Sequence, residues 1–214
     1  MKAVVFDMDG VIVDSEPANL KQLADFMKTY GVVPDDAFLH SLVGSSISYT
    51  AIQCTKVMKQ TWSEQEFNTQ LDAYALAHPV VYKSIIREGI KETLLQLHKN
   101  GFRTAIASSA PLMNIQRMLQ ECDLVEAFDI VLSGEMFAES KPNPEIYLKA
   151  AEKLGCLPEE CIAVEDSHFG IEAGLRAGMR TIAFEDQRFG TDQSKANEKI
   201  NNIKELLDLL HLTQ

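Results

Sequence analysis

The amino-acid sequence predicts an α/β fold in which a parallel sheet carries helices on both faces and a helical insert interrupts the chain. Short apolar runs typical of buried strands alternate with helical patterns through most of the 214 residues. One long stretch, 17–85, breaks this alternation and shows helical patterns throughout. Acidic and hydroxyl side chains directly follow several of the runs, as is typical of ligand sites beyond the carboxyl ends of parallel strands.

The predicted strands are short runs rich in Val, Ile and Ala, bounded by polar residues. Helical patterns separate successive runs, and such crossover connections are required when neighbouring strands run parallel. In chain order the strands are Ala3–Phe6, Thr104–Ala107, Ile130–Leu132, Ile162–Val164 and Arg180–Ala183. A short helix near the end of the chain, over Ile203–Leu210, is expected to close the core.

The insert is predicted from helical spacing and from helix-end signals. Apolar residues recur every three or four positions over 20–30, and Gly31 is a suitable helix terminator. Ser63 followed by Glu66 forms the pattern of a capping box at the start of another helix.

We therefore expect two domains. Residues 1–14 and 86–214 would form the α/β core domain, and residues 15–85 would form the helical domain. The chain would cross between them near 13–17 and 79–88.

The composition is that of an ordinary globular protein, and it narrows the choice of partners. Hydrophobic residues make up 46% and charged residues 24% of the chain. The 20 Lys and Arg against 31 Asp and Glu give a formal net charge of −11. This balance argues against nucleic-acid binding, because affinity for phosphate backbones comes mostly from Lys and Arg. Binding of a small phosphorylated metabolite needs only a few local hydrogen-bond donors, so the negative net charge does not argue against it. The acidic balance also favours a monomer.

Neither a membrane segment nor a disulfide framework is expected. The sequence has no run of about 18 apolar residues. The apolar start of the chain is interrupted at Asp7 and Asp9 without a signal cleavage site, so we expect the mature protein to begin at Met1. The cysteines have neither CxxC spacing nor zinc spacing with His, which favours free thiols in a reducing cytosol. We therefore expect a cytoplasmic protein without membrane attachment.

The end of the first predicted strand carries the first candidate site. Asp7 and Asp9 stand two residues apart and would point to the same side of an extended segment. Two like charges at that spacing require a cation or a shared proton. Gly10 allows the backbone to turn and to bring amide N–H groups close to an anion. Taken alone, the pattern is equally compatible with an acidic turn that binds nothing.

Three further strand ends supply complementary groups. Ser108 and Ser109 place hydroxyl and backbone donors after the second strand, although Ser at that position also serves as a helix cap. Lys141 lies in a segment that two prolines keep extended. Glu165 and Asp166 add a second acidic pair after another buried strand. Together these groups form a coherent set for Mg²⁺-assisted phosphoryl transfer, because Mg²⁺ prefers carboxylate and phosphate oxygens.

The same segments resemble the haloacid-dehalogenase-like superfamily, in the branch of β-phosphoglucomutases and small sugar-phosphate phosphatases. The resemblance covers essentially the whole chain and rests on segments 7–17, 107–109, 140–144 and 165–174. It implies a Rossmann-like, doubly wound parallel sheet with a small α-helical cap domain inserted after the first strand.

The resemblance also implies roles for individual residues. Asp7 would be the nucleophile that becomes an aspartyl phosphate, and Asp9 the general acid and then base. Ser108 and Lys141 match phosphate-binding positions, to which we add Gly10 and Ser109. The implied Mg²⁺ ligands are Asp7, the backbone carbonyl of Asp9, Glu165 and Asp166.

Three functions remain open at the level of sequence. The leading one is a Mg²⁺-dependent phosphatase of small phosphorylated metabolites, with sugar phosphates as the expected substrates. The second is a β-phosphoglucomutase that interconverts β-glucose 1-phosphate and glucose 6-phosphate. Asn19 and Ile47 stand where the resemblance implies a His and a phosphate-binding Arg in mutases, which favours the phosphatase. The third is a non-catalytic switch that stores a phosphoryl group on Asp7, against which Asp9 and the helical domain argue.

Overall fold

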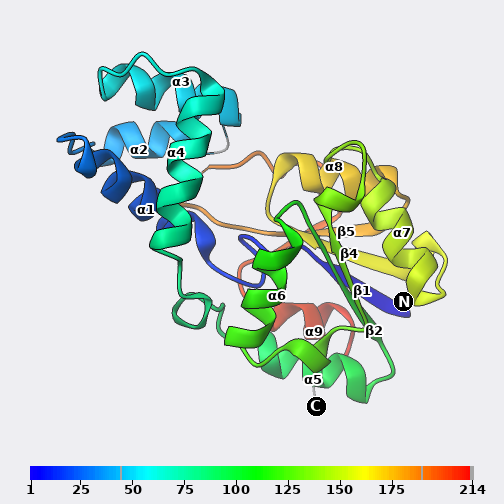
Figure 1. Ribbon diagram of the computed structural model, residues 1–214. Helices are drawn as coiled ribbons and strands as arrows, with labels where there is room; N and C mark the ends of the chain where they lie inside the picture. Colours follow the sequence, from blue (N-terminus) through cyan, green and yellow to red (C-terminus); the bar gives the residue numbers. More distant parts are fainter. Residues whose placement is uncertain (44, 189, 213–214) are drawn as a thin grey trace. The chain divides into compact units, whose positions relative to one another are not determined.

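The computed structural model describes residues 1–43, 45–188 and 190–212. The chain divides into two compact units (Figure 1). The larger unit combines Met1–Asp14 with Tyr82–Gln214, and the smaller unit is Ser15–Val81.

The larger unit is built on a six-stranded parallel sheet with the order β3-β2-β1-β4-β5-β6, which confirms the predicted fold class. The sequence analysis did not predict β6. This short strand pairs with β5, and its charged residues Glu198 and Lys199 do not form the apolar run by which the other strands were predicted. The strands are β1 (Ala3–Phe6), β2 (Arg103–Ser108), β3 (Ile130–Ser133), β4 (Cys161–Glu165), β5 (Arg180–Phe184) and β6 (Glu198–Ile200).

Helices cover both faces of this sheet (Figure 1). One face packs against α5 (Ile90–Lys99), α6 (Leu112–Glu121) and α9 (Glu205–Leu209). The other packs against α7 (Glu145–Leu154) and α8 (His168–Arg176). Short 3₁₀ turns complete the unit at Tyr82–Ser84, Val125–Ala127, Gly134–Met136 and Pro158–Glu160.

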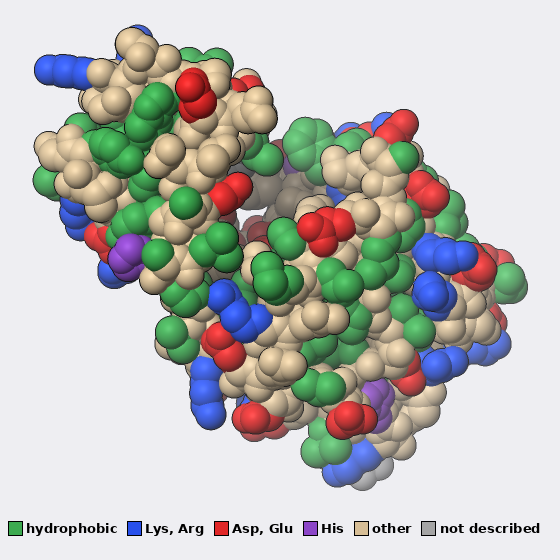
Figure 2. Space-filling view, in the orientation of Figure 1, with side chains coloured by type: hydrophobic (Ala, Val, Ile, Leu, Met, Phe, Trp, Pro, Cys, Tyr) green, Lys and Arg blue, Asp and Glu red, His purple; other side chains and the backbone are tan. Residues whose placement is uncertain are grey.

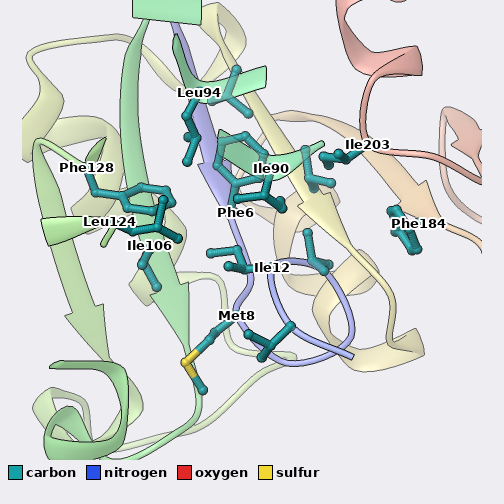
Figure 3. Packing of buried hydrophobic residues seen from close by; sticks show 14 of the residues in the cluster. Phe6, Met8, Ile12, Ile90, Leu94, Ile106, Leu124, Phe128, Phe184 and Ile203 are labelled. Carbon is teal, nitrogen blue, oxygen red and sulfur yellow. The ribbon is translucent and has the colours of Figure 1, made fainter. Parts of the chain in front are cut away.

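The face toward α5, α6 and α9 presents large side chains, and we call it the bulky face. Successive strand residues point to opposite faces, so every second residue of a strand belongs to this side. Phe6 packs edge-on against Phe128 with 6.0 Å between ring centroids (Figure 3). The bulky face is contributed by Val4, Phe6, Ile106, Ile162, Val164, Ile182 and Phe184.

The face toward α7 and α8 presents small side chains, and we call it the alanine face. A Cβ atom added at Gly174 of α8 would lie 2.7 Å from Thr181 Oγ1 and 3.0 Å from the Cβ of Ala163. Glycine therefore allows α8 to pack directly on the sheet. The strand residues of this face are Ala3, Val5, Ala105, Ala107, Leu132, Cys161 and Ala163.

The smaller unit is helical, with a separate core. The capping box at Ser63 and Glu66 is confirmed: the Ser63 Oγ accepts from the Glu66 N–H, and the Glu66 carboxylate accepts from the Ser63 N–H. Phe26 lies at the centre of an aromatic cluster with Tyr30, Phe67 and Tyr74. The helices are α1 (Ser15–Thr29), α2 (Asp36–Leu42), α3 (Ile47–Val57) and α4 (Glu64–Ala77).

The surface and the thiols are unexceptional. Acidic and basic side chains are interspersed on the face of the larger unit shown in Figure 2. Among the described residues, no helix combines the length and the hydropathy needed to cross a membrane. All four cysteines are free thiols.

Candidate active site

The chain reverses immediately after β1 and leaves two carboxylates at the carboxyl edge of the sheet. The Asp7 N–H still donates to the Val164 carbonyl at 2.9 Å, so Asp7 continues the pairing of β1 with β4. The turn is closed by the Ile12 N–H, which donates to the Met8 carbonyl at 2.9 Å. Gly10 takes the left-handed conformation with a φ of +77°, which favours glycine.

Strand alternation places Asp7 and Glu165 on the same side. Ala3 and Val5 belong to the alanine face, and Asp7 follows them at the same two-residue spacing. Glu165 likewise ends β4 two residues after Ala163. Because β1 and β4 are hydrogen-bonded neighbours, two carboxyl groups end side by side on the alanine face.

Lys141 joins these two carboxylates. Its ammonium Nζ donates to Asp7 Oδ1 at 2.7 Å and to Glu165 Oε1 at 2.5 Å. A third bond, 2.9 Å long, goes to the carbonyl of Ala107 in β2. The side chain of Lys141 is 7% exposed, so these charge-assisted bonds form in a largely dry environment.

Glu165 is fully buried, and its carboxylate accepts further hydrogen bonds from the segments around it. The Tyr147 hydroxyl of α7 donates to Glu165 Oε1 at 2.7 Å. The Ser167 hydroxyl donates to Oε2 at 3.1 Å. A Cβ atom at Gly170 of α8 would lie 1.9 Å from the carboxyl carbon of Glu165, so only glycine leaves room for the carboxylate.

A third carboxylate completes the acidic side of the site. Asp7, Glu165 and Asp166 each offer an oxygen, and these oxygens all lie within 4.8 Å of one another. A Cβ atom at Gly10 would lie 1.9 Å from Asp166 Oδ2, so the close approach of Asp166 also requires glycine there. Three hard oxygen donors balanced by one ammonium fit a divalent cation such as Mg²⁺.

Burial, together with repulsion between neighbouring carboxylates, raises the pKa of two acids in the site. Burial raises the pKa of Asp7 to about 7, and the charges of Glu165 and Asp9 add to this shift while Lys141 opposes it. Burial, together with Glu165 and Asp7, also raises the pKa of Asp166 well above its ordinary value. Burial lowers the pKa of Lys141, but the attraction of Asp7 and Glu165 outweighs it and the net shift is upward. An added cation would favour the ionised carboxylates.

The remaining predicted residues differ in burial: Ser108 is buried, Asp9 is half-buried and Ser109 is exposed. Ser108 ends β2, is buried, and accepts a hydrogen bond from the Ala110 N–H at 3.1 Å through its Oγ. Ser109 follows it and is exposed. Asp9 is half-buried, and its carboxylate is not a member of the three-carboxylate group found among the described residues.

Two residues in contact with the site elements were missed by the sequence analysis. In the sequence, Tyr147 is indistinguishable from the other apolar residues of an amphipathic helix. The hydrogen bond from its hydroxyl to Glu165 depends on how α7 packs against the sheet. Arg87 precedes α5 without any motif, yet its Nε donates to the Gly10 carbonyl at 2.9 Å. Only the tertiary contacts reveal either residue.

The fold and the site together define a class: an α/β enzyme with a carboxylate–lysine site at the carboxyl edge of a parallel sheet and a helical unit inserted after the first strand. Residues 4–184 match the family model described as haloacid dehalogenase-like hydrolase. The chain belongs to this family, which confirms the resemblance inferred from its motifs.

Several relatives carry names of phosphatases. The chain is 32% identical to hexitol phosphatase B of Escherichia coli O157:H7, over 95% of this chain and 93% of the relative. It is 28% identical to a phosphorylated carbohydrates phosphatase of Thermotoga maritima, over 85% of this chain and 84% of the relative. A solved β-phosphoglucomutase structure from Clostridium difficile has a TM-score of 0.75 at 23% identity, covering 99% of this chain and 96% of that one, and shares the fold.

Proposed function

We propose that the protein is a Mg²⁺-dependent phosphatase of small phosphorylated metabolites that works through a phosphoryl group on Asp7. The observation that carries the proposal is the buried group of Asp7, Glu165 and Asp166 around the Lys141 ammonium. Phosphoryl transfer depends mainly on positioning and on stabilising negative charge, and this group supplies a carboxylate nucleophile beside a fixed cation.

The metal would be held by the carboxylates of Asp7, Glu165 and Asp166, together with the backbone carbonyl of Asp9. When bound, Mg²⁺ would screen the negative charge of the transferring phosphoryl group. Glu165 already accepts hydrogen bonds from Lys141, Tyr147 and Ser167, so it also fixes the lysine.

In the first step, a carboxylate oxygen of Asp7 attacks the phosphorus atom of the substrate. A bond forms between Asp7 and phosphorus while the bond from phosphorus to the leaving oxygen breaks. Asp9 donates a proton to that oxygen, so the product departs as a neutral alcohol. The Lys141 ammonium and the Ser108 segment would hold the phosphoryl oxygens during the transfer.

In the second step, a water molecule attacks the phosphorus atom of the aspartyl phosphate. Asp9, now ionised, accepts a proton from this water, and the bond between phosphorus and the Asp7 oxygen breaks. Inorganic phosphate is released and both aspartates return to their starting protonation states. Covalent catalysis thus divides one difficult displacement into two easier ones.

We further propose phosphorylated sugars or sugar alcohols as the substrate class. The names of two relatives, hexitol phosphatase B and phosphorylated carbohydrates phosphatase, support this choice. The absence of the mutase-like His and Arg at Asn19 and Ile47 supports hydrolysis over isomerisation.

The deciding experiment measures inorganic phosphate released by the purified protein with Mg²⁺ over a panel of phosphomonoesters. The panel contains hexitol 6-phosphates, glycerol phosphate and β-glucose 1-phosphate, and Asp7→Asn is the control variant. We expect phosphate release that requires both Asp7 and Mg²⁺.

Two other outcomes would contradict the proposal. Formation of glucose 6-phosphate from β-glucose 1-phosphate without release of phosphate would establish a mutase. Stoichiometric labelling of Asp7 without turnover would establish a phospho-accepting switch.

A further inference from the structure

Arg87 binds the turn that carries Asp9 through both its backbone and its side chain. Its N–H donates to the Ile12 carbonyl at 2.9 Å, and its Nε donates to the Gly10 carbonyl at 2.9 Å. Arg87 follows Gly10 by 77 positions in the sequence. A distant segment therefore fixes the Gly10–Val11 peptide, one residue after Asp9.

The guanidinium of Arg87 is itself firmly held. Its Nη2 lies 3.2 Å from Asp14 Oδ1 and 3.3 Å from Asp186 Oδ2. The guanidinium carbon stands 4.6 Å from the centre of the Phe184 ring, a cation–π contact at the end of β5. The side chain is 17% exposed, so Arg87 has little freedom to release Gly10.

Gly10 connects this arginine with the proposed catalytic groups. It follows Asp9 directly, and its Cα lies so close to Asp166 that a Cβ atom there would be 1.9 Å from the carboxylate Oδ2. Its N–H donates to the Val13 carbonyl at 2.8 Å, which closes the turn. A shift of the Gly10 peptide would therefore move Asp9 and disturb the contact with Asp166.

We propose that Arg87 is a positioning residue for Asp9. By holding the Gly10 carbonyl, it keeps the Asp9 carboxyl group where it can protonate the leaving oxygen. The inference rests on the proposed function, since it requires that Asp9 act as the general acid. It adds a residue that makes no contact with the phosphoryl group and that acts through the turn.

The geometry requires arginine at this position. A guanidinium is a planar fork, so Nε can bind Gly10 while Nη2 binds the two aspartates. Lysine keeps the positive charge but has a single ammonium nitrogen, which cannot bind the Gly10 carbonyl and both aspartates at the same time. Arg87→Lys should therefore retain the ion pairing in part and lose the hold on Gly10. An error of about 1 Å in the position of a catalytic group can lower a rate about 100-fold.

The test compares two leaving groups in single-turnover experiments with Mg²⁺. An alkyl phosphate such as a hexitol 6-phosphate needs a proton on its leaving oxygen, whereas p-nitrophenyl phosphate releases a stable phenolate without one. For Arg87→Lys, we expect alcohol release to fall at least about 30-fold and nitrophenolate release to fall less than about threefold, since general acid catalysis contributes 10²–10⁴-fold. With active enzyme in saturating excess, the rate constant of a single turnover does not depend on the fraction of competent molecules, so partial unfolding does not affect the comparison.

Three further variants complete the experiment. Asp9→Asn should show the same discrimination between leaving groups, and more strongly. Asp186→Asn, which removes one of the two carboxylates that hold the guanidinium, should show a weaker form of it. Arg180→Lys is the matched control, because Arg180 forms a forked pair with Glu198 at the opposite end of β5. It should change both rates by less than twofold.

The outcomes separate a failure of the inference from a failure of the proposed function. Equal loss on both substrates for Arg87→Lys, with clear discrimination in Asp9→Asn, would overturn the positioning role and leave the phosphatase intact. Phosphate release that does not require Asp7, or the absence of discrimination in Asp9→Asn, would contradict the proposed function and the inference with it.

Discussion

The two faces of the central sheet are packed with side chains of different size. The candidate site lies at the end of the face with the smaller side chains. The bulky face meets its helices through Phe6, Ile106 and similar residues. The alanine face meets α7 and α8 through small residues, and Asp7 and Glu165 extend its strands. Small residues let α7 and α8 approach closely enough for Tyr147 and Ser167 to bind Glu165. On the alanine face, packing and site geometry are therefore inseparable, whereas on the bulky face we expect packing to serve stability.

The most severe test removes the cation of the alanine face. Lys141→Met keeps a side chain of similar length but leaves Asp7 and Glu165 buried without their ammonium. We expect the free energy of unfolding to fall by about 3–5 kcal/mol, as for other broken buried ion pairs. The rate of phosphate release should fall about 1000-fold, because a fixed charge that stabilises the transferring group is lost. Denaturant unfolding and phosphate assays measure the two effects.

Comparing the wild type and Lys141→Met with and without Mg²⁺ tests whether the same carboxylates bind the metal. Added Mg²⁺ should raise the midpoint of unfolding of the wild type, and it should raise that of Lys141→Met by more, because the carboxylates have lost their counter-charge. Lys149→Met is the matched control, since Lys149 pairs with Glu152 on the exposed side of α7. If Mg²⁺ leaves the midpoint of unfolding unchanged in both the wild type and Lys141→Met, the proposed metal site is excluded.

A cavity on the bulky face tests the other half of the comparison. Leu94 of α5 is buried in that core, and Leu94→Ala should lower the free energy of unfolding by about 2–5 kcal/mol. The kcat and KM of the folded protein should stay within a factor of two, because Leu94 touches the side of the sheet opposite Glu165. A change in kcat comparable with that of an alanine-face variant would break the distinction between the two faces.

Deleting one oxygen atom tests the link between packing and site on the alanine face. Tyr147→Phe removes the hydroxyl that donates to Glu165 Oε1 at 2.7 Å and preserves the ring. Hydrogen bonds to charged groups contribute about 1.5–3 kcal/mol, so we expect a loss of about 2 kcal/mol in unfolding free energy. We also expect kcat to fall severalfold, because Glu165 positions Lys141. A loss of stability with unchanged kcat would limit Tyr147 to a structural role.

The sequence was sufficient to predict most of the sheet and the gathering of acidic residues at one of its edges. Buried central strands are nearly continuous apolar runs, and a parallel sheet must bring their carboxyl ends to one edge. The structure accordingly brings Asp7, Lys141 and Glu165 together. It was not sufficient for Tyr147 and Arg87, which contact partners 18 and 77 positions away. Such contacts depend on packing that no local pattern encodes.

The smallest expected effect concerns a charged cluster at the end of β5, beyond the bulky face. Asp186 is bonded by Arg188 and Arg87, and these bonds lower its pKa from 3.8 to about 2, although partial burial opposes the shift. Because the folded-state pKa lies below the ordinary value, the pairing stabilises the protein above about pH 4. This contribution is lost as the pH falls from about 4 toward 2.

A comparison with Asp186→Asn isolates this contribution. At pH 6 the variant should be less stable than the wild type by no more than about 1 kcal/mol, because solvent screens the cluster. The difference should shrink through the acidic window as Asp186 of the wild type becomes protonated. A difference that stays constant from pH 6 to pH 2 would show that the charge of Asp186 contributes nothing, and that this cluster holds Arg87 through shape and through the Phe184 ring alone.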